Sequence, residues 1–219
     1  MPTASTIVFA GGDPGDASFL RALDYAGCFI VAVDRGLSVA AELGLTPDLF
    51  VGDGDSVPLH LLEALDRTRT RVVMLPVRKD VSDLEAAFDT LAATGHTGPV
   101  LVLAGLGGRL DHCLFNLQLA ARYMTPFQSV SFEDDQCLVR PLAGSTVLQL
   151  PLEATVSFVP ETAEVEVSLA GFAYPLDHAL VQRGSTRLLS NVVSSAIQHV
   201  DVHRGLVFMI AWKHQIEHT

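Results

Sequence analysis

The feature that most constrains the fold is an alternation of short apolar runs with stretches of helical length across residues 1–135. The apolar runs are rich in Val, Ile, Leu and Phe at consecutive positions, which is typical of strands covered on both faces. They span residues 6–10, 28–33, 48–51, 71–75, 100–104 and 128–132. This alternation predicts an α/β domain built on a doubly wound, mostly parallel sheet.

Two of the intervening stretches carry clear helical signals, residues 82–93 and 110–123. The first begins with a capping box, in which Ser82 precedes Glu85 by three positions. Apolar residues at helical spacing predict one buried face on each helix. The expected faces are Leu84, Ala87, Phe88 and Leu91 in the first helix and Leu110, Leu114, Leu117 and Ala121 in the second.

The pattern changes after Asp135, where short β-like runs are separated by glycine and proline. Residues 164–169 alternate strictly between polar and apolar, as a half-exposed strand should. The remaining runs are 137–140, 146–150, 155–159, 187–189, 196–202 and 206–211. We therefore expect two domains: residues 1–135, and a small antiparallel β-sandwich over residues 136–219.

Charge and composition exclude several classes of protein. The net charge of −11 opposes general nucleic-acid binding, which needs a cationic surface. No apolar run approaches the roughly 18 residues that span a bilayer, and residues 1–5 contain no Lys or Arg, which argues against a signal peptide. Three widely spaced cysteines read as reduced thiols. We expect a cytoplasmic protein that binds neither membrane nor nucleic acid.

Acidic residues follow two successive apolar runs, where ligands bind in open α/β sheets. Asp34, followed by Gly36, could accept hydrogen bonds from a nucleotide, although a helix N-cap is the alternative. Asp53 and Asp55 are two positions apart and point the same way in an extended chain. Their mutual repulsion predicts a bound cation, and hard oxygen ligands suit Mg²⁺ or Ca²⁺. An exposed Gly/Asp turn is the alternative.

Two further motifs follow the fourth and fifth runs. Residues 79–83, Lys-Asp-Val-Ser-Asp, open the capped helix, and a helix N-terminus favours anions, although capping alone also explains this segment. Residues 107–111, Gly-Gly-Arg-Leu-Asp, combine glycines that allow close ligand approach with an arginine suited to phosphate. Only two lysines occur in the chain and the P-loop motif is absent. An anion site here would therefore need metal ions, backbone N–H groups and arginines.

The order and spacing of these motifs, with Ser190-Asn191 in the β-rich region, resemble the thiamine pyrophosphokinase family. The resemblance implies transfer of a diphosphate group from ATP to thiamine, giving thiamine diphosphate and AMP. It implies Mg²⁺ held by Asp53, Asp55 and Asp83, and a thiamine site near Ser190 and Asn191. The residues implied at the nucleotide site are Asp34, Gly36, Lys79, Asp80, Ser82, Gly107, Gly108, Arg109 and Asp111.

The resemblance also implies a homodimer with the active site at the subunit boundary. We expect the β-rich region to join the subunits, because the apolar run 206–212 is longer than one sandwich face needs. Two other functions remain open. One is a related pyrophosphokinase acting on another small alcohol, such as a hydroxymethylpterin, and the other is a non-catalytic nucleotide-sensing module.

Overall fold

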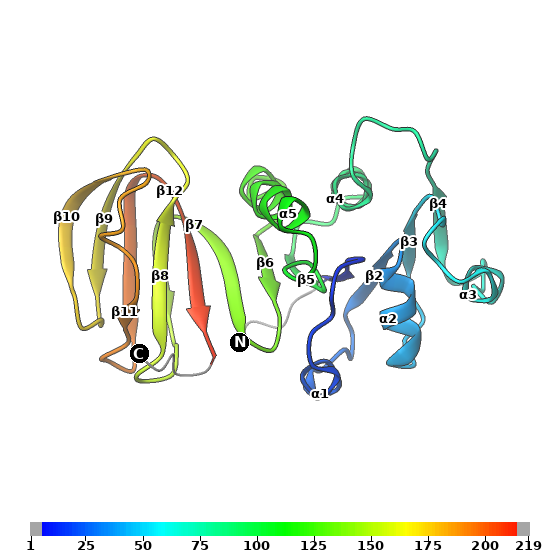
Figure 1. Cartoon of the computed structure of the whole chain (residues 1–219), viewed down its shortest axis with the longest axis horizontal. Coiled ribbons are helices and arrows are strands. Elements are labelled where there is room, and N and C mark those ends of the chain that lie inside the picture. Colours follow the sequence, from blue (N-terminus) through cyan, green and yellow to red (C-terminus); the bar gives the residue numbers. More distant parts are fainter. Residues whose placement is uncertain (1–5, 214–219) are drawn as a thin grey trace. The chain divides into compact units, whose positions relative to one another are not determined.

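The computed structural model describes residues 6–213, which divide into two compact units with the boundary between Asp135 and Gln136 (Figure 1). Residues 1–5, from which the sequence predicts the lack of a signal peptide, lie outside the described residues, as do residues 214–219. Within the described part of the chain, no helix has both the length and the apolar character needed to cross a bilayer.

The first unit contains one sheet of six parallel strands connected through helices, and each predicted strand bound lies within one residue of the observed one. The strands are β1 (Thr6–Phe9), β2 (Phe29–Val33), β3 (Leu49–Gly52), β4 (Arg71–Met74), β5 (Pro99–Leu103) and β6 (Ser129–Glu133). The helices are α1 (Ala17–Ala22), α2 (Gly36–Glu42), α3 (Leu59–Glu63), α4 (Asp83–Ala93) and α5 (Leu110–Arg122). The mixed α/β character predicted from the alternation is confirmed.

The strand order of this sheet is β6-β5-β1-β2-β3-β4. The chain therefore runs outward from β1 to β4 and returns to β5 on the other side of β1. In open sheets of parallel strands, ligands bind beyond the carboxyl ends of the strands, where the order reverses in this way. The loops after β1 and β5 consequently stand at the reversal, and the loops after β2, β3 and β4 follow along the same edge.

Burial confirms the predicted face of α4 and contradicts that of α5. Helix α4 buries Leu84, Ala87, Phe88 and Leu91, and its N-cap hydroxyl, Ser82 Oγ, accepts a 3.1 Å hydrogen bond from Glu85 N. In α5, however, Leu110 and Leu114 are 73% and 54% exposed, while Leu119 and Ala120 are buried. Phe88, Tyr123 and Phe127 form an aromatic cluster in the core. Only the C-terminal end of α5 reaches this cluster, where Tyr123 packs edge-on against Phe88.

The second unit is an antiparallel β structure in which two long strands pair along most of their length. It consists of β7 (Cys137–Leu148), β8 (Thr155–Pro160), β9 (Glu164–Ala170), β10 (Leu176–Gln182), β11 (Asn191–Val192) and β12 (Gln198–Trp212). β12 pairs with β7 on one side, and with β9 and then β8 on the other. A register shift between Val202 and Val207 allows this change of partner.

Several strand predictions in this unit are wrong. Runs 137–140 and 146–150 join in β7, and runs 196–202 and 206–211 join in β12, because each long strand supplies the other with partners across the predicted gap. Residues 187–189 lie in a turn and a bend, in which Leu189 N donates to Thr186 O at 3.0 Å, and the next residue, Ser190, has a left-handed backbone (φ +55°). β10 went unpredicted because a bulge between Leu176 and Ala179 breaks its alternation.

The C-terminal apolar run does not support the expected subunit interface. Val207, Met209 and Ala211 belong to the buried core of the second unit, where β12 lies between β7 and β8. The run is therefore used by the core of its own unit, and its length is no argument for a dimer.

Candidate active site

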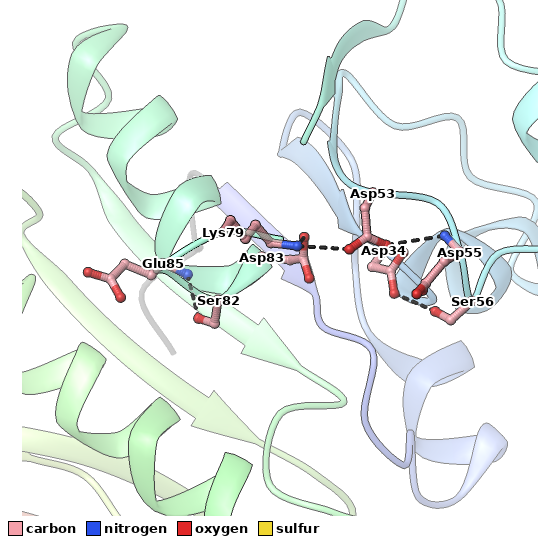
Figure 2. A network of polar contacts seen from close by, with 8 residues as sticks. All are labelled: Asp34, Asp53, Asp55, Ser56, Lys79, Ser82, Asp83 and Glu85. Atoms are coloured by element: carbon pink, nitrogen blue, oxygen red, sulfur yellow. Dashed lines mark hydrogen bonds and ion pairs between the residues drawn. The ribbon is translucent and has the colours of Figure 1, made fainter. Parts of the chain in front are cut away.

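Three carboxylates converge at the carboxyl ends of β2 and β3. Asp34 follows β2, and Asp53 and Asp55 follow β3. The two strands are parallel neighbours with Val33 opposite Val51, so their ends meet at one edge of the sheet. One oxygen from each carboxylate lies within 4.8 Å of the other two (Figure 2). The sequence predicted the pairing of Asp53 with Asp55, and the sheet adds Asp34 to it.

Local hydrogen bonds orient these carboxylates. Asp34 has a left-handed backbone (φ +46°), its amide donates to Val51 O at 2.9 Å, and its Oδ2 accepts a hydrogen bond from Ser56 Oγ. Its Oδ1 is buried and accepts no hydrogen bond from the described residues. Asp55 N donates to Asp53 Oδ1 at 3.2 Å. A buried oxygen without a donor, placed among other carboxylates, suits a cation.

Lys79 links this group to a fourth carboxylate, Asp83 at the start of α4 (Figure 2). Lys79 Nζ lies 2.8 Å from Asp53 Oδ2 and 3.2 Å from Asp83 Oδ1. The side chains of Lys79 and Asp53 are only 13% and 9% exposed. Asp83 therefore contacts the cluster through the ammonium group of Lys79.

The pKa shifts in this group follow from its crowded charges. The hydrogen bond from Lys79 lowers the pKa of Asp53, and the negative charge of Asp53 raises the pKa of Asp55. Burial raises the pKa of Asp83, with Lys79 acting in the opposite direction. The hydrogen bond to Asp53 raises the pKa of Lys79. Four carboxylates with one ammonium group form a site of hard oxygen donors with excess negative charge, and this donor set fits Mg²⁺.

Two glycine-containing loops meet at the reversal of strand order, after β1 and after β5. Gly12 N donates to Ala104 O at 2.9 Å. A Cβ atom on Gly12 would lie 2.6 Å from Ala104 O, and one on Gly107 would lie 2.6 Å from Asp13 Cβ. The loops approach this closely because neither glycine has a side chain. The second loop was predicted from its Gly-Gly-Arg motif, whereas the first was not, although Gly11-Gly12 directly follows a predicted strand.

Arg109, the residue just before α5, contacts Asp111 in the first turn of that helix. Two hydrogen bonds join them, Nε to Oδ1 at 3.1 Å and Nη2 to Oδ2 at 2.5 Å, and both side chains are exposed. The hydrogen bond from Arg109 lowers the pKa of Asp111 to about 2. Asp111 is therefore a weak proton acceptor while this pair is intact.

The other residues predicted at the nucleotide site have different surroundings. Asp80 is exposed in the loop before α4, and Ser82 is exposed at the end of that loop. Gly108 is exposed in the turn before α5. Gly36 is buried at the start of α2, where a Cβ atom would overlap the carbonyl oxygen of Phe9. Close packing of α2 on β1 is thus sufficient to explain this glycine.

Comparison with protein families identifies the two units. The thiamin pyrophosphokinase catalytic domain matches residues 22–131, about half of the chain. The thiamin pyrophosphokinase vitamin B1 binding domain matches residues 145–207. The chain belongs to the thiamin pyrophosphokinase family. The carboxylate cluster, Lys79 and the loop containing Gly107 fall within the match to the catalytic domain, whereas the loop containing Gly12 precedes it.

Individual members of this family resemble the chain along most of its length. Thiamine pyrophosphokinase of Bacillus subtilis is 26% identical over 184 residues, covering 82% of this chain and 85% of the relative. The crystal structure of thiamin pyrophosphokinase from Geobacillus thermodenitrificans is 28% identical, with a TM-score of 0.80 over 95% of this chain and 98% of that one. The crystal structure of the Bacillus subtilis protein superposes with a TM-score of 0.82, covering 94% of this chain and 97% of that one.

Ser190 and Asn191 lie in the second unit, within the match to the vitamin B1 binding domain. Asn191 is buried, its Oδ1 accepts from Tyr174 N at 3.0 Å and its Nδ2 donates to Tyr174 O at 2.9 Å. Ser190 N donates to Ser157 Oγ at 2.9 Å. Asn191 therefore fixes the backbone of Tyr174, whose side chain is 67% exposed. Tyr174 was not predicted, because its link to Asn191 joins residues 17 positions apart in the chain.

Proposed function

We propose that this protein transfers a diphosphate group from ATP to the hydroxyethyl group of thiamine, giving thiamine diphosphate and AMP. The observation that carries the proposal is a carboxylate cluster at the strand ends of a chain that matches both domains of one pyrophosphokinase family. Relatives that cover most of the chain bear the name thiamine pyrophosphokinase. Both substrates of the proposed reaction are implied by this family.

We propose that the cofactor is Mg²⁺ and that Asp53, Asp55 and Asp83 hold it, joined by Asp34, which offers an oxygen within 4.8 Å of those of Asp53 and Asp55. The support is the convergence of three carboxylates and the buried, unpartnered Oδ1 of Asp34. When bound, Mg²⁺ would neutralise phosphate charge and orient the phosphate chain. The same negative surroundings also favour the cationic thiazolium ring of thiamine.

ATP is proposed to bind along the same edge of a doubly wound nucleotide domain. The reversal of strand order at β1 and β5 supports this location. We propose that backbone N–H groups of the second glycine loop, residues 105–108, contact phosphate oxygens, since these amides donate to no backbone carbonyl of the described residues. Arg109 stands at the end of the second loop, exposed and able to exchange Asp111 for a phosphate group.

In the proposed reaction, the thiamine hydroxyl oxygen forms a bond with the β-phosphorus of ATP. The bond between that phosphorus and the oxygen bridging to the α-phosphate breaks, AMP leaves, and the hydroxyl group loses its proton. Reactions of this kind require mainly positioning and electrostatic stabilisation from the protein. The low pKa of Asp111 favours a positioning role for this residue over that of general base.

Analysis of the nucleotide products tests the proposal. Incubation with ATP, Mg²⁺ and thiamine should produce AMP and thiamine diphosphate in equal amounts. Accumulation of ADP with thiamine monophosphate would refute diphosphate transfer. Turnover with a hydroxymethylpterin but not with thiamine would reassign the acceptor, and binding of ATP without turnover of any alcohol would favour a nucleotide sensor.

We also propose a cytoplasmic homodimer. The cytoplasmic location is supported by three cysteines that form no disulfide within residues 6–213. Exposed apolar side chains support self-association: Leu114 and Phe115 of α5 are 54% and 69% exposed, and Leu180 and Leu189 of the second unit are 55% and 63% exposed. Light scattering should give twice the 23.4 kDa chain mass at assay concentration. A fully active monomer would contradict this proposal.

A further inference from the structure

Lys79 is the one basic side chain, within residues 6–213, that forms an ion pair with the carboxylates of the cluster. Its ammonium group lies between Asp53 and Asp83, at 2.8 and 3.2 Å from their oxygens. These oxygens belong to the residues that the proposed Mg²⁺ site requires. The ammonium group and a divalent cation therefore compete for the same negative charge.

The loop that carries Lys79 is otherwise loosely attached. Residues 76–78 and 80–82 are exposed, whereas the side chain of Lys79 is folded inward and 13% exposed. In the described part of the chain, no backbone group of residues 76–81 forms a hydrogen bond. The ion pair with Asp53 is thus the main polar attachment of this loop to the strand ends, whereas the pair with Asp83 is local, four positions along the chain. Moving the ammonium group requires little other structure to break.

We propose that Lys79 is an internal competitor of the divalent cation, which keeps metal affinity low until the nucleotide binds. Without nucleotide, Lys79 occupies Asp53 and Asp83. A triphosphate brings several negative charges to the same edge of the sheet, and an ammonium group is a good partner for phosphate. Lys79 then moves from the carboxylates to the phosphate chain, and Asp53 and Asp83 become available to the cation.

This inference rests on the proposed function, and it gives Lys79 two opposite effects. Lys79 weakens metal binding to the free protein, because it neutralises and blocks the carboxylates. It strengthens binding of the metal–nucleotide complex, because it contacts the phosphates. Binding of metal and nucleotide must therefore be positively coupled, by the same factor in both directions. A lysine that only stabilised the fold would not have effects of opposite sign.

The test measures Mn²⁺ binding by electron paramagnetic resonance, with and without a non-hydrolysable ATP analogue. Lys79→Met should bind Mn²⁺ on the order of tenfold more tightly than the wild type without nucleotide, the effect of removing one charged hydrogen-bond partner. With the analogue, the same variant should bind the complex several-fold more weakly. Arg78→Met is the matched control, since it removes the same charge from an exposed side chain without an ion pair among the described residues. It should change both affinities little.

The outcomes separate this inference from the proposed function. Equal or weaker Mn²⁺ binding by Lys79→Met without nucleotide, while the wild type binds the metal–nucleotide complex, would overturn the competition and leave the site intact. Absence of Mn²⁺ binding in every protein, with or without the analogue, would overturn the metal site and the competition together. Lys79→Gln, which keeps hydrogen-bond donors without the charge, serves if the methionine variant does not fold, and the same increase in Mn²⁺ affinity is expected.

Discussion

Replacing Gly36 with alanine separates a packing role of this glycine from a role in nucleotide binding. Gly36 is the buried first residue of α2 and lies two residues after Asp34. An added Cβ atom would overlap the carbonyl oxygen of Phe9 and lie 2.6 Å from its carbonyl carbon, whereas real Cβ atoms essentially never come within 3.0 Å of such an atom. The helix or the strand must therefore shift, and Asp34 would move with the helix.

The balance of two effects sets the expected magnitude. Alanine is favoured over glycine within a helix by about 1 kcal/mol. Overpacking a core costs about 1–3 kcal/mol, occasionally more. The upper end applies here, because Phe9 is fully buried and β1 is paired on both sides. The free energy of unfolding should fall by about 2 kcal/mol, which corresponds to a Tm decrease of about 4–8 °C for a chain of this size.

Urea unfolding followed by circular dichroism measures this loss of stability. An unchanged m-value would show that both proteins expose the same amount of surface on unfolding. Gly44→Ala is the control, since Gly44 has a φ of +71° and no neighbouring atom within 4 Å of an added Cβ. Its backbone strain alone should cost roughly 1 kcal/mol, less than the overlap at Gly36. Wild-type stability of Gly36→Ala combined with weakened nucleotide binding would refute the packing argument and make Gly36 a ligand contact.

Three further predictions concern named side chains. Asp53→Asn and Asp55→Asn should each lower kcat at least about 100-fold with non-additive losses in the double variant, and near-normal steady-state rates would exclude a shared metal site. Arg109→Lys should lower kcat/KM for ATP although charge is kept, because lysine lacks the paired donors of arginine; unchanged kinetics would remove Arg109 from the phosphate site. Because the hydrogen bond that its ring donates to Glu166 raises the pKa of His178, this pair should stabilise the fold fully below about pH 6.5 and lose its effect as the pH rises through the raised pKa. An NMR titration should show Glu166→Gln lowering the His178 pKa, and equal pKa values in both proteins would contradict the assignment.

Predictions from the sequence succeeded where the signal was local. The parallel strands of the first unit are apolar over consecutive residues, since both faces are covered, and each was located to within one residue. The cap of α4 depends on a hydrogen bond between residues three positions apart. The failures were non-local. The buried face of α5 depends on how far the helix reaches beyond the aromatic cluster, and the continuity of β7 and β12 depends on their pairing with each other.

The sequence by itself determined which acidic residues follow the apolar runs, and hence that carboxylates would gather at one edge of the sheet. Which carboxylates meet was decided by the strand order, because β2 and β3 are neighbours and bring Asp34 to Asp53 and Asp55. The contact of Lys79 with Asp53 spans 26 positions of sequence, and no spacing rule predicts it. Residue types and local periodicity are properties of the chain, whereas the distances between charges on different loops exist only after the sheet has formed.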